Sequence, residues 1–226
     1  MTDDPRERLL DAALPHVAFD GWGEATFRAA CADAGLAPAL ARAVCPRGAV
    51  DLALAYHARG DRAMRARLAA SDLSAMRFRD RIATAVRFRL QAAEDREVVR
   101  RGSALFALPQ NAALGARAIW GTADAIWEAL GDSSRDINWY TKRATLSAVY
   151  GATLLYWLGD DSEGHQASWD FLDRRIEDVM RFEGAKARWR DRPALQRAME
   201  GPLSFLSRIT APAGPPADMP GHEGGK

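Results

Sequence analysis

Several residue patterns that identify common enzymes and metal proteins are missing from this chain. The four histidines are scattered, and none is part of a Glu-x-x-His or His-x-x-x-His pair. The two cysteines do not form a Cys-x-x-Cys pair. These are the spacings that build iron and zinc sites. A Gly-rich phosphate loop, a dinucleotide-binding glycine motif and a nucleophile elbow are missing as well. These absences predict a protein that is not an enzyme and that binds no metal or cofactor.

Cysteine and long apolar runs are also scarce. Cys31 and Cys45 are too few for a disulfide framework, so we expect two buried free thiols in a reducing compartment. No apolar run reaches the roughly 18 residues that span a bilayer, and the first residues lack the pattern of a secretory or transit segment. With the Ala- and Arg-rich usage, these features predict a bacterial protein, cytoplasmic or peripheral on the inner membrane.

The chain has no surplus of charge of one sign. It holds 31 basic and 30 acidic side chains, a formal net charge of +1. Proteins that bind nucleic acid through the phosphate backbone usually show a basic surplus. The balance therefore argues against a nucleic-acid partner.

Residues that favour helices fill most of the sequence. Ala, Leu, Arg and Glu are abundant, Val, Ile and Thr are sparse, and no alternating strand pattern persists. An all-α fold is predicted, with apolar stripes at helical spacing. The expected helices are Arg6–Phe19, Glu24–Ala34, Pro38–Val44, Ala49–Ala70, Arg79–Glu94, Asp95–Phe106, Ala112–Leu130, Asp136–Leu158 and Ser168–Phe182.

The first three predicted helices, with a glycine turn at Gly35, follow the helix-turn-helix plan. The order Leu10-Asp11-Ala12-Ala13, Gly21-Trp22 and Gly35-Leu36 resembles the N-terminal domain of TetR-family repressors. This resemblance implies a TetR-like helix-turn-helix head followed by a helical bundle with a ligand site between its helices.

The chemistry of the head argues against DNA reading. A recognition helix needs basic and polar side chains for phosphates and base edges, but residues 36–44 offer one long donor, Arg42. Residues 1–70 hold nine Lys/Arg and nine Asp/Glu, a balance of zero. A TetR-type regulator that binds a hydrophobic effector nevertheless remains the alternative hypothesis.

The stretch Asp136-Ile137-Asn138-Trp139-Tyr140-Thr141-Lys142-Arg143 is the most informative motif. Asp136 is predicted to cap a helix, and Trp139 and Tyr140 fall on diverging faces of it. Either Trp139 is a core residue and Tyr140 a surface one, or both belong to an exposed aromatic patch that anchors a partner.

The same stretch closely resembles a signature of the Coq-nine family, lipid-binding accessory proteins of ubiquinone biosynthesis. The likeness spans roughly residues 6–183. It includes Leu108-Pro109-Gln110-Asn111, Gly131-Asp132-Ser133-Ser134, the run from Ala144 to Tyr150, and Ser168-Trp169-Asp170-Phe171-Leu172-Asp173-Arg174-Arg175-Ile176.

The resemblance implies a protein that binds isoprenoid quinone intermediates and presents them to the demethoxyubiquinone hydroxylase. The docking residues carried over from the family motif are Asp136, Asn138, Trp139, Tyr140 and Arg143, with Leu108, Pro109 and Asn111. The candidates for lipid contact, chosen from the apolar faces of the bundle, are Ile119, Trp127, Leu146, Tyr150 and Trp157.

The character of the chain changes after Phe182. Residues 183–210 hold six Lys/Arg and three Asp/Glu, and an apolar stripe runs between the charges. This stripe could dock on the bundle, bind a partner or lie on a membrane surface, and the resemblance to the family favours the membrane. The predicted membrane residues are Trp189, Leu195, Met199, Leu203, Phe205, Leu206 and Ile209.

Four segments are expected from these patterns. They are a TetR-like head at 1–70, a lipid-binding bundle at 71–183, an amphipathic membrane helix at 184–210 and a disordered, Pro- and Gly-rich tail at 211–226. A homodimer is also expected, since TetR-like bundles commonly pair. A third hypothesis, an enzyme that acts on the lipid itself, has no supporting motif.

Overall fold

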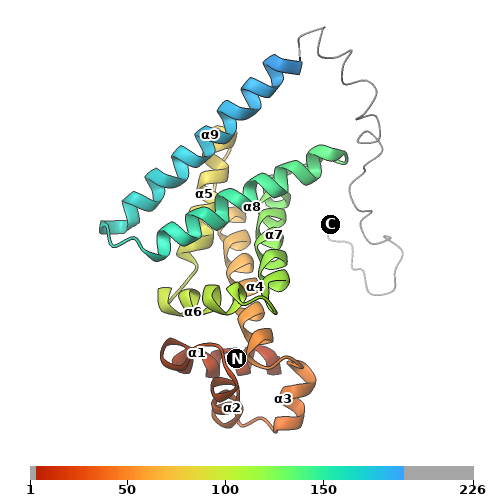
Figure 1. The fold of residues 1–226 in the computed structure, drawn as a ribbon, viewed down its shortest axis with the longest axis vertical. Helices are drawn as coiled ribbons and strands as arrows, with labels where there is room; N and C mark the ends of the chain where they lie inside the picture. Colours follow the sequence, from red (N-terminus) through yellow and green to blue (C-terminus); the bar gives the residue numbers. More distant parts are fainter. Residues whose placement is uncertain (1–3, 191–226) are drawn as a thin grey trace.

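The computed structural model describes residues 4–190, with side chains as far as residue 182, and every regular element in that part of the chain is helical (Figure 1). This confirms the predicted all-α fold class. The α-helices of these residues are α1 (Pro5–Asp20), α2 (Glu24–Asp33), α3 (Pro38–Val44), α4 (Ala49–Ala69), α5 (Phe78–Gln91), α6 (Arg96–Ala107), α7 (Ala112–Ala129), α8 (Ile137–Leu158) and α9 (Gln166–Arg190).

Capping residues and glycines set many of these boundaries. The Asp95 carboxylate accepts a hydrogen bond from the backbone N–H of Glu97 at 2.7 Å and so begins α6. Gly21 follows α1 with a φ of 71°, and Gly35 lies after α2 with a φ of 61°. Residues with a β-carbon rarely adopt these angles, so glycine ends both helices.

Helices α1, α2, α3 and the first part of α4 form the head around one apolar cluster. Leu9, Leu10 and Leu52 are fully buried there, and Trp22 and Phe27 pack around them. Both cysteines are buried in the head as free thiols, as expected. The head is the lower part of the molecule in Figure 1.

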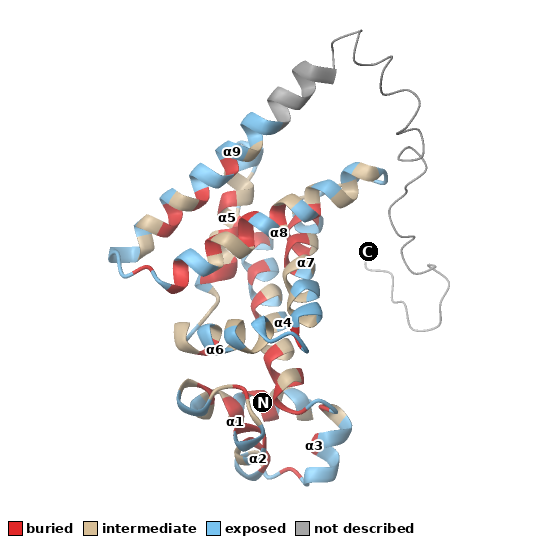
Figure 2. Cartoon of the chain, viewed as in Figure 1, coloured by how far each residue is buried: buried red, intermediate tan, exposed pale blue. Residues whose placement is uncertain are grey.

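The body consists of the second part of α4 with α5, α7, α8 and α9. Helices α5 and α7 pack against α4, α8 packs against α7, and α9 packs against α5 and α8. Figure 2 shows buried residues along α4, α7 and α8, and Met64, Ile126 and Tyr150 are among the most deeply buried. Helix α6 lies across the junction of head and body (Figure 1). Helix α4 contributes to both apolar clusters, with residues up to Ala53 in the cluster of the head and Met64 in the cluster of the body.

Two helix ends differ from those predicted by more than two residues. Helix α9 was expected to end at Phe182 but continues to Arg190, because residues 185–190 are mostly Ala, Lys and Arg, and one Gly weakens a helix without ending it. Helix α5 ends at Gln91, not at Glu94, because the next residues form the turn that leads to the Asp95 cap.

Candidate functional site

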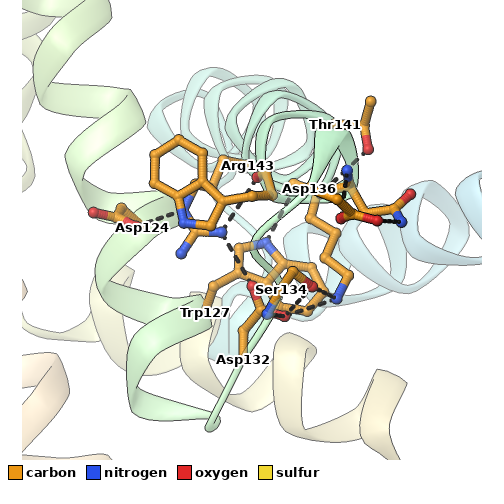
Figure 3. Close-up of polar contacts among 10 residues, drawn as sticks. Asp124, Trp127, Asp132, Ser134, Asp136, Thr141 and Arg143 are labelled. Carbon is orange, nitrogen blue, oxygen red and sulfur yellow. Dashed lines mark hydrogen bonds and ion pairs between the residues drawn. The ribbon is translucent and has the colours of Figure 1, made fainter. Parts of the chain in front are cut away.

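The Asp136 motif begins α8, as the sequence predicts. The Asp136 carboxylate accepts hydrogen bonds from the backbone N–H of Asn138 at 3.0 Å and from its side-chain amide at 2.8 Å (Figure 3). These contacts fix the first turn of α8. They orient the motif against α7, with which α8 packs extensively.

Arg143 lies beneath the motif and not on its surface. Its side chain is 3% exposed, and the guanidinium donates to Asp124 on α7 at 2.5 Å and to Asp132 in the α7–α8 turn at 3.1 Å (Figure 3). The guanidinium also lies 4.0 Å from the centre of the Trp139 ring. The prediction that Arg143 forms part of an exposed docking surface is therefore wrong, because its charge is used to join α7, the turn and α8.

Asp132 is the second centre of this network. Its carboxylate accepts hydrogen bonds from Lys142 at 2.7 Å and from the Ser134 hydroxyl at 2.8 Å, in addition to Arg143. Burial alone would raise the pKa of Asp132, but the hydrogen bonds from Lys142, Ser134 and Arg143 lower it to about 2. Asp132 is therefore ionised at neutral pH and holds the turn against α8.

Three aromatic side chains gather above this network, and we call them the aromatic cluster: Trp120, Trp139 and Tyr140. The Trp139 ring is 4.8 Å from the Tyr140 ring, edge-on, and 6.0 Å from the Trp120 ring. All three residues are half-buried. The sequence left Trp139 as either a core residue or part of an exposed patch. In the structure Trp139 is partly packed and partly exposed, so it matches neither alternative fully.

Trp120 was missed in the sequence, although a signal was present. Trp120, Asp124 and Trp127 are spaced by four and three residues on α7, so they share one face of that helix. All three contact the start of α8, through Trp139, Arg143 and Lys142 respectively. Such a face of two tryptophans and an acid could have been paired with the aromatic and cationic residues of α8.

The Leu108–Asn111 turn joins α6 to α7 at some distance along α7 from the aromatic cluster. Leu108 and Pro109 are exposed, so their role as docking residues stays a prediction. Asn111 is buried, and its side-chain amide donates to the Leu105 carbonyl at 3.2 Å. The prediction that Asn111 contacts a partner is therefore wrong for its side chain, which stabilises the turn.

A cavity of about 290 Å³ opens beside the motif, and we call it the motif cavity. Its apolar wall includes Trp127 and Leu146, two of the predicted lipid contacts, together with Ile82, Ile176 and Val179. The remaining wall is polar and comes largely from the motif itself, through Asn138, Thr141 and Lys142.

A second cavity, of about 320 Å³, lies where the head meets the body, and we call it the junction cavity. Ile119 and Tyr150, two further predicted lipid contacts, line it. The predicted lipid residues are therefore divided between two cavities. Trp157 lines neither of them, because its ring packs against His165 at 5.6 Å in the α8–α9 corner.

The predicted membrane residues lie at or beyond the limit of the description. Trp189 belongs to α9, but its side chain is outside the described part of the chain. Leu195, Met199, Leu203, Phe205, Leu206 and Ile209 lie outside the described residues.

Two further features of the described residues bear on the site. No helix of the described part has the length and apolar character to cross a membrane. Within residues 4–190, no group of three or more His, Cys, Asp or Glu side chains is arranged to hold a metal ion.

Comparison with known proteins finds similarity to the COQ9 proteins. Residues 112–183 match the COQ9 family model. The probable ubiquinone biosynthesis protein coq9, mitochondrial, of Dictyostelium discoideum is 27% identical over 183 residues, which cover 77% of this chain and 59% of that protein. The ubiquinone biosynthesis protein COQ9, mitochondrial, of Drosophila melanogaster is 30% identical over 190 residues, 80% of this chain and 57% of the relative.

The chain thus spans less than two thirds of the length of these relatives. Among solved structures, the TetR transcriptional regulator from Nitrosomonas europaea ATCC 19718 matches with a TM-score of 0.62 at 22% identity, over 77% of this chain and 97% of that one. At this identity the likeness shows the fold alone. Together the matches confirm both resemblances seen in the sequence: the chain is similar to the COQ9 proteins and has a TetR-like fold.

Proposed function

We infer that this protein takes part in ubiquinone biosynthesis by binding an isoprenoid quinone intermediate in the motif cavity and presenting it to a separate hydroxylase. The relatives are named for ubiquinone biosynthesis, which supports the process. The observation that carries the proposal is the position of the cavity. Its apolar wall lies directly beside Asn138, Thr141 and Lys142 of the family signature.

A carrier is needed because a prenyl tail resists leaving the bilayer. Removing each methylene-sized group from an apolar environment costs about 0.8 kcal/mol, so each five-carbon unit costs several kcal/mol. An apolar cavity lowers this cost by offering the tail an equivalent surrounding. With a volume of about 290 Å³, the motif cavity is at the lower end of ligand sites. It suits a head group with the first part of its tail, while the rest of the tail stays in the membrane.

Exposed apolar side chains beside the motif cavity support a membrane location. Phe78 and Met180 line the cavity and are 47% and 56% exposed, and Phe182, two residues further along α9, is 68% exposed. Apolar groups gathered in this way suit insertion into the interface of a bilayer. Helix α9 leads from here toward the predicted membrane segment. A peripheral membrane position, with this end toward the bilayer, is part of the proposal.

Lipid extraction and mass spectrometry of protein purified from ubiquinone-producing cells test the ligand and its cavity. Thr145 is half-buried at the wall of the motif cavity, so Thr145→Phe should fill that cavity and lower the bound isoprenoid severalfold. The control is Gly151→Leu, which should leave the bound isoprenoid unchanged. Gly151 lines the junction cavity, and the position of its absent β-carbon is open space. Wild-type protein free of isoprenoid would overturn the proposed function, and loss in the control alone would move the ligand to the other cavity.

Flotation with vesicles that contain anionic phospholipid tests the membrane surface. Phe182→Ser should reduce the floated fraction, because it removes an exposed aromatic ring from the proposed contact. Phe19→Ser is the matched control, since Phe19 is 82% exposed but lies in the head. Equal flotation of the two variants would reject this surface.

For the partner, we propose that the hydroxylase docks on the aromatic cluster and the Leu108–Pro109 turn. Leu108→Ser should weaken copurification with the demethoxyubiquinone hydroxylase. Leu40→Ser should not, although Leu40 in the head is as exposed as Leu108, at 45% against 44%. Protein purified without the hydroxylase tests whether the chain itself is a catalyst. Turnover of a quinone precursor by that protein alone would contradict the proposed role as a carrier.

The TetR-like fold keeps a DNA-binding regulator as the second candidate. The basic side chains of the head argue against DNA binding, because they already contact groups within the protein. Arg42, the long donor of α3, pairs with Glu24 and stacks on Phe27, and Arg6 is bound to the Val44 carbonyl. A gel shift with genomic DNA fragments that weakens steeply with salt would revive this candidate.

A further inference from the structure

The motif cavity has one basic wall residue outside the family signature, Arg79. It is the second residue of α5 and lines the cavity together with its neighbour Phe78. The side chain of Arg79 is 44% exposed, and its Nε donates to Asp80 at 3.3 Å, a long hydrogen bond. No other hydrogen bond or ion pair holds this guanidinium in the described part of the chain. Most of its donors are therefore available to a ligand.

Arginines outnumber carboxylates around Arg79. Asp80 is held more closely by Arg77, whose Nε donates to it at 2.8 Å. Glu177 on α9 is the other nearby carboxylate, and Arg181 donates to it at 2.9 Å. The hydrogen bond from Arg181 and, to a smaller extent, the charge of Arg79 lower the pKa of Glu177. Three arginines thus share two carboxylates, and one positive charge is left over at the cavity wall.

The other charged groups next to the cavity are paired with one another. Arg175 forms an ion pair with Asp178 on α9 at 2.8 Å, and Lys142 donates to Asp132 at 2.7 Å. A neutral ligand gains little from the surplus charge of Arg79, whereas an anionic ligand finds a counter-charge beside an apolar wall. The cavity therefore favours an isoprenoid that carries one negative charge on its head group.

Two aromatic rings of the wall favour a flat head group. The rings of Phe78 and Trp127 both line the cavity, with their centroids 5.5 Å apart. Because Phe78 directly precedes Arg79, the aromatic surface and the surplus charge belong to the same part of the wall. A flat, conjugated ring with a negatively charged oxygen suits both.

Hydroxylation of a quinone produces such a ring. A hydroxyl on a quinone is conjugated with a carbonyl across the ring, so it is a vinylogous carboxylic acid. It loses its proton to water at neutral pH and becomes a planar anion. A quinone that carries only alkyl and methoxy groups stays neutral. The substrate and the product of a quinone hydroxylase therefore differ by one negative charge.

We propose that Arg79 makes the motif cavity selective for a prenylated hydroxyquinone anion, the product class of the hydroxylase, over the neutral quinone that the hydroxylase consumes. The inference rests on the proposed function, because it assigns the head group of the isoprenoid in that site. It also gives the carrier a direction. The neutral intermediate leaves the cavity more easily, and the hydroxylated product returns and is held by Arg79.

Titration calorimetry of the full chain at neutral pH tests the head group with two matched probes. Lapachol, a prenylated hydroxynaphthoquinone, is ionised, and its O-methyl ether has the same ring and tail without the charge. A nearby opposite charge lowers the pKa of an acid by about one to three units, and the partial exposure of Arg79 favours the lower end. We therefore expect lapachol to bind about tenfold more tightly than the ether. Equal binding of the two probes, or equally tight binding of decanoate, which has a charge but no ring, would overturn the proposal.

Three variants tie the selectivity to Arg79. Arg79→Gln should remove the roughly tenfold preference for lapachol over its ether. Arg174→Gln is the matched control and should keep the preference, because Arg174 is an exposed arginine of α9 that does not line the cavity. Asp80→Asn should tighten lapachol binding, since it frees Arg79 from its carboxylate. An equal loss of preference in Arg79→Gln and Arg174→Gln would reduce the effect to net charge and contradict the assignment.

Visible absorbance gives a second readout, because the lapachol anion differs in colour from the neutral form. The pKa of lapachol bound to the wild type should be about one unit lower than that of lapachol bound to Arg79→Gln, and equal values would rule out an ion pair with Arg79.

The position of the probe and the proposed function are tested separately. Thr145→Phe should abolish binding of both probes, and unchanged binding in this variant would place them outside the motif cavity. Equal binding of lapachol and its ether would remove only the present inference, whereas wild-type protein that purifies without isoprenoid would remove the proposed function.

Discussion

Replacing Arg143 by Met should destabilise the fold strongly, because Arg143 joins three segments from within. Met keeps much of the length of the side chain and its packing, while it removes the charge and every donor. The change leaves Asp124 without the guanidinium that lies at 2.5 Å, and Asp132 without one of its partners. It also removes the cation that stacks on the Trp139 ring at 4.0 Å.

The expected loss can be worked from the exposure of the two carboxylates. Breaking a buried ion pair from one side costs about 3–5 kcal/mol, since an uncompensated charge remains. The Asp124 side chain is 31% exposed and can regain water, and Asp132 keeps Lys142 and Ser134. We therefore expect the lower end, about 3 kcal/mol, which corresponds to a fall in the thermal midpoint of roughly 6–12 °C for a chain of this size.

Denaturant unfolding followed by circular dichroism measures this loss through the midpoint and slope. Arg117→Met is the control, because Arg117 is an exposed residue of α7 and such changes usually stay within about 0.5 kcal/mol. A loss below about 1 kcal/mol, or one equal to the control, would refute the burial argument. It would return Arg143 to the role of a surface contact.

Two more perturbations probe the polar contacts of the core. The pKa of Asp132 is lowered from 3.8 to about 2, so its contribution of about 2 kcal/mol is present above about pH 4 and is lost as the pH falls from about 4 to 2. An acid titration of the free energy of unfolding should therefore be flatter by this amount in Asp132→Asn than in the wild type. Parallel curves for the two proteins would contradict the lowered pKa. Gly60→Ala should lower the free energy of unfolding by about 2 kcal/mol, because a β-carbon there would stand 2.5 Å from Nη1 of Arg89 and displace its ion pair with Asp61. Gly121→Ala meets open space and should raise the free energy of unfolding by up to about 1 kcal/mol, measured by chemical denaturation. A stabilised Gly60→Ala variant would show that Arg89 can move aside.

The parts of the fold that depend on neighbouring residues could be predicted from the sequence. Helix ends followed the caps and glycines closely, as at Asp95, Asp136 and Gly21, because these signals act within a few residues. Pairings between distant residues could not be predicted in this way. Asp124 and Arg143 are 19 residues apart, and nothing in the periodicity of α7 or α8 alone says that their side chains meet. For the same reason the sequence predicted Arg143 as a surface residue, although the structure buries its charge.

The two cavities show most clearly why apolar periodicity does not locate a ligand. Ile119 and Trp127 belong to one apolar face of α7, but eight residues separate them, which is about 12 Å along the helix. Ile119 therefore reaches the junction cavity and Trp127 the motif cavity. On α8, Val149 and Tyr150 are neighbours in the chain and point to different cavities, because successive residues of a helix are turned by about 100°. A stripe identifies residues that avoid water, whereas the crossing of α6 and α9 over the bundle decides which of them face a cavity and which, like Trp157, face only other side chains.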